Sequence, residues 1–74
     1  MYEVYTDGSS LGNPGRGGWA AISMDFKLCG SQMNTTNNIM EMTAIIKALE
    51  QCRHINKHNV RIITDSNYVK QGIT

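Results

Sequence analysis

The sequence predicts an α/β fold, in which a mixed β-sheet is crossed by one helix. Residues 2–7 alternate between two faces with the period of a β-strand, and residues 39–54 repeat apolar side chains at helical spacing. Residues 59–65 form a second apolar stretch that again has the character of a strand. Because a helical crossover between strands is right-handed and covers the sheet, we expect residues 59–65 to run parallel to residues 2–7.

The composition limits the class of protein. A chain of 74 residues forms at most one small domain. Its two cysteines are too few for a disulfide scaffold, and no Cys-x-x-Cys spacing indicates zinc, so we expect a reduced, cytoplasmic setting. No apolar run is long enough to cross a membrane. The net charge of +1 gives no general attraction to nucleic acid, so any such binding must be local.

The first half of the chain predicts an antiparallel meander. After the strand at residues 2–7, residues 8–18 hold five of the seven glycines and the only proline, which predicts a loop whose backbone can approach a ligand closely. Residues 18–24 follow as a second strand. A turn at residues 25–27 leads into a short third strand at residues 28–33.

The second half predicts the crossover and the last strand. The polar segment 34–38 offers helix caps, and the helix that follows carries its apolar stripe on Met42, Ile45, Ile46, Leu49 and Cys52. Basic residues gather at its C-terminal end, where they suit the helix dipole. Residues 59–65 are apolar on both faces, which indicates a central strand. Ser66 then caps a helical turn that reaches Lys70.

Three of the six acidic residues lie at the edges of these elements. Asp7 ends the first strand, Asp65 ends the last strand, and Glu41 lies in the first turn of the helix. Because ligand crevices in such sheets lie at the carboxyl ends of parallel strands, we expect the three carboxylates to converge. Convergent carboxylates are what a hard cation such as Mg²⁺ binds.

Each of these residues also has a purely structural interpretation. Asp7 before Gly8 suits a turn, Glu41 suits a capping box with Asn38, and Asp65 suits a cap before the last helical turn. The glycine-rich segment lacks the Gly-Lys-Ser/Thr of a phosphate-binding loop and is equally consistent with a plain connector. We expect aromatic residues Tyr2, Trp19 and Phe26 to lie in or near the core, both cysteines to fill the core as small apolar groups, and both histidines to be solvated.

Three sequence blocks resemble the type 1 ribonuclease H family, the bacterial ribonuclease HI group. They are TDGSSLGNPG at residues 6–15, TTNNIME at residues 35–41 and TDSNYVKQGIT at residues 64–74. The resemblance runs the whole length of the chain and implies a ribonuclease H-like fold, of which residues 1–74 form a single incomplete domain. The implied activity is hydrolysis of the RNA strand of an RNA–DNA hybrid with Mg²⁺ or Mn²⁺.

The resemblance also implies roles for individual residues. Asp7, Glu41 and Asp65 match the first three of the family's four catalytic, metal-binding carboxylates, and the backbone carbonyl of Gly8 is a further candidate ligand. The candidate contacts to the hybrid are Ser10, Gly12, Asn13, Gly15, Arg16, Asn37, Asn38 and Asn67. Asn67 stands where the bacterial enzymes usually have glutamine.

The chain departs from the family in its length. No Asp or Glu follows Asp65, so the fourth carboxylate of the two-metal site is absent from this chain and one metal position is expected to be incomplete. We expect the sheet to show an uncovered apolar face and an unpaired strand edge, which invite a complementary C-terminal half or a second copy of the chain. The alternative function is that of a non-catalytic remnant that binds hybrids or dimerises.

Overall fold

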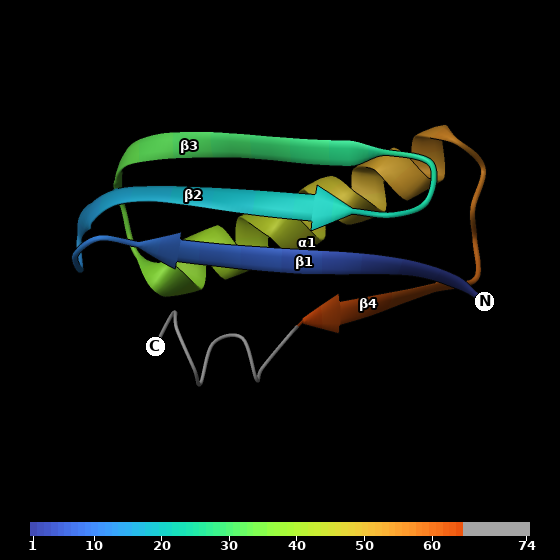
Figure 1. Cartoon of the computed structure of the whole chain (residues 1–74), viewed down its shortest axis with the longest axis horizontal. Coiled ribbons are helices and arrows are strands. Elements are labelled where there is room, and N and C mark those ends of the chain that lie inside the picture. Colours follow the sequence, from blue (N-terminus) through green and yellow to red (C-terminus); the bar gives the residue numbers. More distant parts are fainter. Residues whose placement is uncertain (65–74) are drawn as a thin grey trace.

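The computed structural model describes residues 1–64, which form a four-stranded mixed sheet with one helix packed on one of its faces (Figure 1). The elements are β1 (Tyr2–Ser10), β2 (Gly15–Ile22), β3 (Lys27–Thr35), α1 (Asn37–His54) and β4 (Val60–Thr64). β1, β2 and β3 form an antiparallel meander, β4 lies parallel to β1, and the strand order is β3-β2-β1-β4. The predicted fold class is confirmed, and the helical turn predicted at residues 66–70 lies outside the described residues.

The glycine-rich segment is mostly strand, so the prediction of a loop over residues 8–18 is wrong. β1 continues to Ser10 and β2 begins at Gly15, and Ser10 pairs with Gly17. The backbone N–H of Leu11 donates to the carbonyl of Arg16 at 2.7 Å and closes the hairpin. Glycine inside a strand often marks a close approach by another backbone, and this role replaces the predicted loop flexibility.

Apart from Met40, the helix faces the sheet with small side chains. Its buried residues recur at every fourth position and are Met40, Ala44, Ala48 and Cys52. The predicted stripe is therefore wrong except for Cys52 and the partly buried Ile45: Met42, Ile46 and Leu49 are 59%, 48% and 47% exposed. Alanine allows the helix to approach the strands closely, and this proximity decides which face is covered.

The start of α1 also differs from the prediction. Thr36 is the N-cap, and its hydroxyl accepts a hydrogen bond from the backbone N–H of Ile39 at 3.2 Å. Glu41 therefore lies beyond the first turn, which holds no acidic residue. The capping box between Asn38 and Glu41 is excluded, because the partner position three residues after the cap is occupied by Ile39.

The end of α1 is closed by a Schellman motif. Asn56 has a φ of 61°, and its N–H donates to the carbonyl of Arg53 at 3.2 Å. The N–H of Lys57 donates to the carbonyl of Cys52 at 2.8 Å. These two bonds satisfy carbonyls that the helix leaves free, and asparagine tolerates the left-handed conformation that they need.

The core lies between α1 and the sheet. Val4, Ala21, Ala48 and Cys52 are buried there, and Tyr2, Trp19 and Phe26 pack against them as predicted. Burial raises the pKa of the Cys52 thiol above its usual value. Cys29 is exposed, so the prediction that it fills the core is wrong. His54 and His58 are exposed, as predicted.

β4 lies at the edge of the described sheet, where it pairs with β1 alone, and not in the predicted central position. Its side chains Val60, Ile62 and Ile63 are all partly buried, although they point to alternate faces. No helix in the described part of the chain is apolar enough over its length to cross a membrane.

Candidate active site

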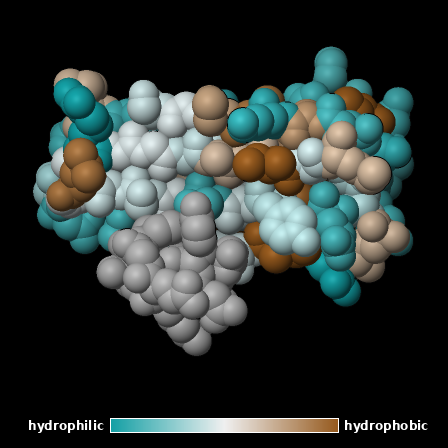
Figure 2. Space-filling model, in the orientation of Figure 1, coloured by the Kyte–Doolittle hydropathy of each residue, from teal (hydrophilic) through white to brown (hydrophobic). Residues whose placement is uncertain are grey.

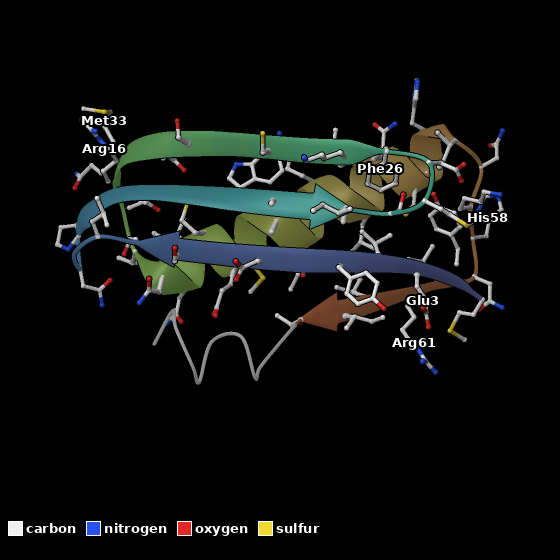
Figure 3. All side chains as sticks on the ribbon, in the orientation of Figure 1. Glu3, Arg16, Phe26, Met33, His58 and Arg61 are labelled. Atoms are coloured by element: carbon white, nitrogen blue, oxygen red, sulfur yellow. The ribbon has the colours of Figure 1, made fainter. Side chains whose placement is uncertain are left out.

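The predicted site residues within residues 1–64 gather at one end of the sheet. This end contains the last residues of β1, the short connection at residues 11–14, the first residues of β2 and the start of α1 (Figure 1). Arg16 marks it in Figure 3, whereas Glu3, His58 and Arg61 lie at the opposite end. The arrangement follows from the hairpin between β1 and β2 and from the helix cap, which both bring the chain back to the same end of the sheet.

Gly8 joins the two described carboxylate positions. It is buried on the helix-facing side of β1, and a Cβ built on it would lie 2.6 Å from the backbone nitrogen of Glu41. Asp7 precedes this contact in β1, and Glu41 forms the other half of it in α1. Both acidic side chains are partly buried. The structure therefore brings residues 7 and 41 into neighbouring positions although they are far apart in the sequence.

The parallel strand carries the chain toward the same point. Thr6 of β1 pairs with Thr64 of β4, which is the last described residue, and Asp7 follows Thr6 in β1. Asp65 and Asn67 lie outside the described residues. Among the residues that the structure does describe, no three His, Cys, Asp or Glu side chains form a metal-binding group.

The donor chemistry of Asp7 and Glu41 suits a hard divalent cation, because carboxylate oxygens are the ligands that Mg²⁺ takes in proteins. Two carboxylates alone provide part of such a site. The fit to the cation therefore depends on further oxygen ligands, for which Asp65 and the Gly8 carbonyl are the predicted sources.

Ser10 and Asn37 tie the end of β1 to the start of α1. The backbone N–H of Ser10 donates to Oδ1 of Asn37 at 2.6 Å, and the Ser10 hydroxyl lies 3.2 Å from the same oxygen. The hydroxyl is also hydrogen bonded to the carbonyl of Gly12. A backbone N–H only donates, so the Asn37 amide oxygen faces β1 and its NH₂ group is left to face outward.

The remaining predicted contacts lie around this tie. Gly12, Asn13, Arg16 and Asn38 are exposed and Gly15 is partly buried. An open hollow of about 270 Å³ lies beside them, lined by Ser9, Ser10, Leu11, Arg16, Gly17, Gly18 and Ser31.

Ser9 and Ser31 are polar residues of this hollow that the sequence analysis missed. For Ser9 the signal was available, since the two-residue period of a strand places it on the same face as Asp7. Ser31 becomes visible only through its pairing with Gly18 across β2 and β3.

Comparison with known families identifies the architecture. The family model of RNase H matches residues 1–74. The chain belongs to the RNase H family. A protein named Ribonuclease H from Parvibaculum lavamentivorans is 51% identical over 78 residues, which cover 100% of this chain and 51% of that protein. A protein of the same name from Ehrlichia chaffeensis is 49% identical and is matched over 50% of its length.

Solved RNase H structures share the fold. LC11-RNase H1, isolated from compost, superposes with a TM-score of 0.79 at 29% identity, covering 100% of this chain and 62% of that one. The N-terminal RNase H domain of a Mycobacterium tuberculosis protein superposes with a TM-score of 0.76 at 26% identity, covering 93% of this chain and 56% of that one. The RNase H chain described here thus spans about half the length of the curated relatives that it matches.

Proposed function

We propose that the chain is the N-terminal half of a ribonuclease H that hydrolyses the RNA strand of RNA–DNA hybrids. One observation carries the proposal: the Gly8 contact places Glu41 of α1 beside the Asp7 end of β1, and the exposed polar residues of the hairpin and the helix start lie at the same end. A related enzyme, LC11-RNase H1, has been solved in complex with an RNA/DNA hybrid, which supports this class of substrate.

In this proposal Asp7, Glu41 and Asp65 hold a divalent cation, Mg²⁺ or Mn²⁺, with the Gly8 carbonyl as a further oxygen ligand. When bound, the cation stabilises negative charge on the scissile phosphate and lowers the pKa of the attacking water. The water oxygen would lose a proton to solvent and form a bond to phosphorus, while the bond to the ribose 3′ oxygen breaks and that oxygen takes up a proton. The products are a 5′-phosphate and a 3′-hydroxyl.

Recognition of the RNA strand falls to the polar groups beside the carboxylates. An RNA strand differs from DNA by its 2′-hydroxyl, which is both donor and acceptor and lies in a wide, shallow minor groove. Hydrogen-bond donors at the carboxylate end of the sheet come from the outward NH₂ group of Asn37, the Asn38 side chain and the segment from Gly12 to Gly18. Arg16 supplies positive charge there. Asn67 completes this set in the proposal.

We assign the missing parts of the enzyme to a C-terminal half of the RNase H domain. The chain spans about half of each curated relative, and α1 exposes large apolar side chains on the side that faces away from the sheet. In this proposal the second half supplies the remaining carboxylate and covers these side chains. A homodimer is the competing arrangement, which covers the surface without adding a carboxylate.

The decisive experiment is cleavage of an end-labelled RNA–DNA hybrid by the chain in Mg²⁺ and in Mn²⁺, with and without a separately supplied C-terminal half of a ribonuclease H. We expect cleavage only in the presence of both halves, with 5′-phosphate ends on the products. Asp7→Asn should abolish cleavage and Mg²⁺ binding with little loss of helix content, since the change removes a charge from a partly buried position without altering volume. Absence of cleavage under every condition would leave the chain as a non-catalytic hybrid-binding remnant.

A further inference from the structure

Residue 8 is a glycine because there is no room for a side chain at this position, and not because the backbone conformation requires glycine. No glycine in the described part of the chain has a positive φ, so Gly8 is not required by a left-handed turn. A Cβ built on it would lie 2.5 Å from the carbonyl oxygen of Met40 and 2.6 Å from the nitrogen of Glu41, and closer still to the carbonyl carbon of Met40. All three are backbone atoms, so no side-chain rotation could relieve the overlap.

Gly17 and Gly30, two other tightly packed glycines on this side of the sheet, meet a side chain first, although Gly17 also faces the backbone oxygen of Ser9 at 2.8 Å. A Cβ at Gly30 would lie 2.7–2.8 Å from three atoms of the Trp19 ring, and at Gly17 the nearest atom is the Thr35 methyl group. Gly8 alone among these three is closed by the backbone of α1 on every one of its nearest contacts. Gly8 directly follows Asp7, and it contacts the peptide bond between Met40 and Glu41.

We infer that Gly8 is a positioning residue for the carboxylate site: by lacking a side chain, it sets how closely the backbone at Glu41 approaches the Asp7 end of β1. This inference rests on the proposed metal site of Asp7 and Glu41. An added methyl group must open the contact from 2.5–2.6 Å to the 3.4 Å or more of ordinary packing, a displacement of α1 by about 1 Å. The Glu41 carboxylate moves with the helix, whereas Asp7 stays on the strand.

A displacement of this size is large enough to affect metal binding and catalysis. A misplacement of about 1 Å can lower a reaction rate by about a hundredfold. Loss of an outer group that orients a ligand typically weakens metal binding by about tenfold to a hundredfold. Gly8→Ala retains the backbone carbonyl at residue 8, so a loss of binding in this variant would report on spacing and not on removal of a ligand atom.

The test compares Gly8→Ala with Gly30→Ala, a matched control on β3, two strands away from Asp7, that adds the same methyl group against the side chain of Trp19, the cross-strand partner of Gly8, and not against the backbone of α1. For each metal-free protein, NMR measures the nuclear Overhauser effect between the backbone amide protons of residue 8 and Glu41, which every variant retains, and thermal unfolding measures stability. Binding of Mn²⁺ alone is then measured from the free-ion electron paramagnetic resonance signal. If Gly8→Ala does not fold in buffer, both measurements are made for all proteins in trimethylamine N-oxide, which favours the compact state.

We expect Gly8→Ala to weaken the contact between residues 8 and 41 and to raise the Kd for Mn²⁺ by about tenfold or more, whereas Gly30→Ala loses stability but keeps the wild-type Kd. A folded Gly8→Ala protein with an unchanged contact between residues 8 and 41, or with a wild-type Kd, would overturn the inference. So would an equal rise in Kd in both variants, because the effect would then follow stability alone. If the wild-type protein binds no Mn²⁺, the proposed metal site fails, and the NMR comparison still decides whether Gly8 sets the approach of α1.

Discussion

At the scale of single residues, the orientation of Asn37 decides what it can recognise. Its amide oxygen accepts from the backbone N–H of Ser10 at 2.6 Å, and a backbone N–H cannot exchange roles with an acceptor. The NH₂ group therefore remains as a pair of donors at the start of α1. Acceptors that match it on a hybrid are the 2′ oxygen of the ribose and the minor-groove edges of the bases.

This orientation separates the stability role of Asn37 from its proposed role in hybrid binding. In Asn37→Asp the carboxylate still accepts from Ser10 and lies at the positive end of the helix dipole, so the free energy of unfolding should stay constant or rise by about 0.5 kcal/mol. The two donors are lost, and affinity for an RNA–DNA hybrid should fall by about tenfold to a hundredfold, the equivalent of a lost hydrogen bond of about 1–3 kcal/mol. Fluorescence anisotropy with a labelled hybrid, in the presence of a supplied C-terminal half, measures the affinity.

Asn37→Ala is the matched control, because it removes the acceptor as well as the donors. It should lower the free energy of unfolding by about 1 kcal/mol in addition to weakening hybrid binding. Hybrid binding by Asn37→Asp at wild-type affinity would show that the outward NH₂ group does not contact the substrate.

At the scale of elements, α1 offers two methionines with opposite environments. Met40 is fully buried against the sheet, and Met42 is 59% exposed on the other side of the same helix. Met40→Ala should lower the free energy of unfolding by about 2–5 kcal/mol, because it leaves a cavity beneath the helix. Met42→Ala should change it by no more than about 0.5 kcal/mol. Urea denaturation of the two variants measures the difference, and equal losses would contradict the observed face of the helix.

The same helix shows where prediction from the sequence succeeded and where it failed. The period of apolar residues located α1 and its C-terminal end at His54 correctly, because that signal is local. The buried face was assigned to the largest apolar side chains, whereas the sheet is covered by Ala44 and Ala48. A large apolar side chain is buried only where the space between helix and sheet can hold it. The distance between α1 and β1 is set by Gly8, which is far from α1 in the sequence.

The candidate site, like the helix, could be predicted from the sequence only in part. Alternation along residues 2–7 and the crossover rule correctly predicted that β4 runs parallel to β1, since both depend on elementary chain geometry. The cap at Thr36 and the hydrogen bonds between Ser10 and Asn37 were not predictable, because the five polar residues 34–38 offer equivalent caps. The glycines in β2 were mistaken for loop residues, since their tight packing against other chain segments is visible only in three dimensions.

At the scale of the whole molecule, the described residues form two layers with apolar surface on both outer sides. On the face that α1 leaves uncovered, Met1, Tyr5, Ile22 and Met24 line an open hollow of about 360 Å³. Figure 2 shows this face, with hydrophobic surface between the middle of the sheet and the end where β1 begins. On the opposite side, Ile39, Met42, Ile46 and Leu49 are each about half exposed on α1. Apolar patches of this kind mark interaction surfaces.

These surfaces predict that the chain associates, either with a C-terminal half of the RNase H domain or with a second copy. Ile46 is 48% exposed at the centre of the outer side of α1, so Ile46→Glu should leave the helix content and the core intact. A charge buried without a partner in an interface costs several kcal/mol, so the same change should weaken association by about a hundredfold. Gel filtration with light scattering measures the mass of the complex.

The control is Lys47→Glu, which reverses a charge at the next position of α1 on a side chain that is 49% exposed and faces Glu50 at 3.9 Å. This pair is a surface ion pair of small energy, so its loss should affect association little. A wild-type chain that remains a stable monomer at micromolar concentration, both alone and with the C-terminal half, would contradict the prediction. Equal weakening by Ile46→Glu and Lys47→Glu would show that charge, and not apolar contact on the outer side of α1, governs the interaction.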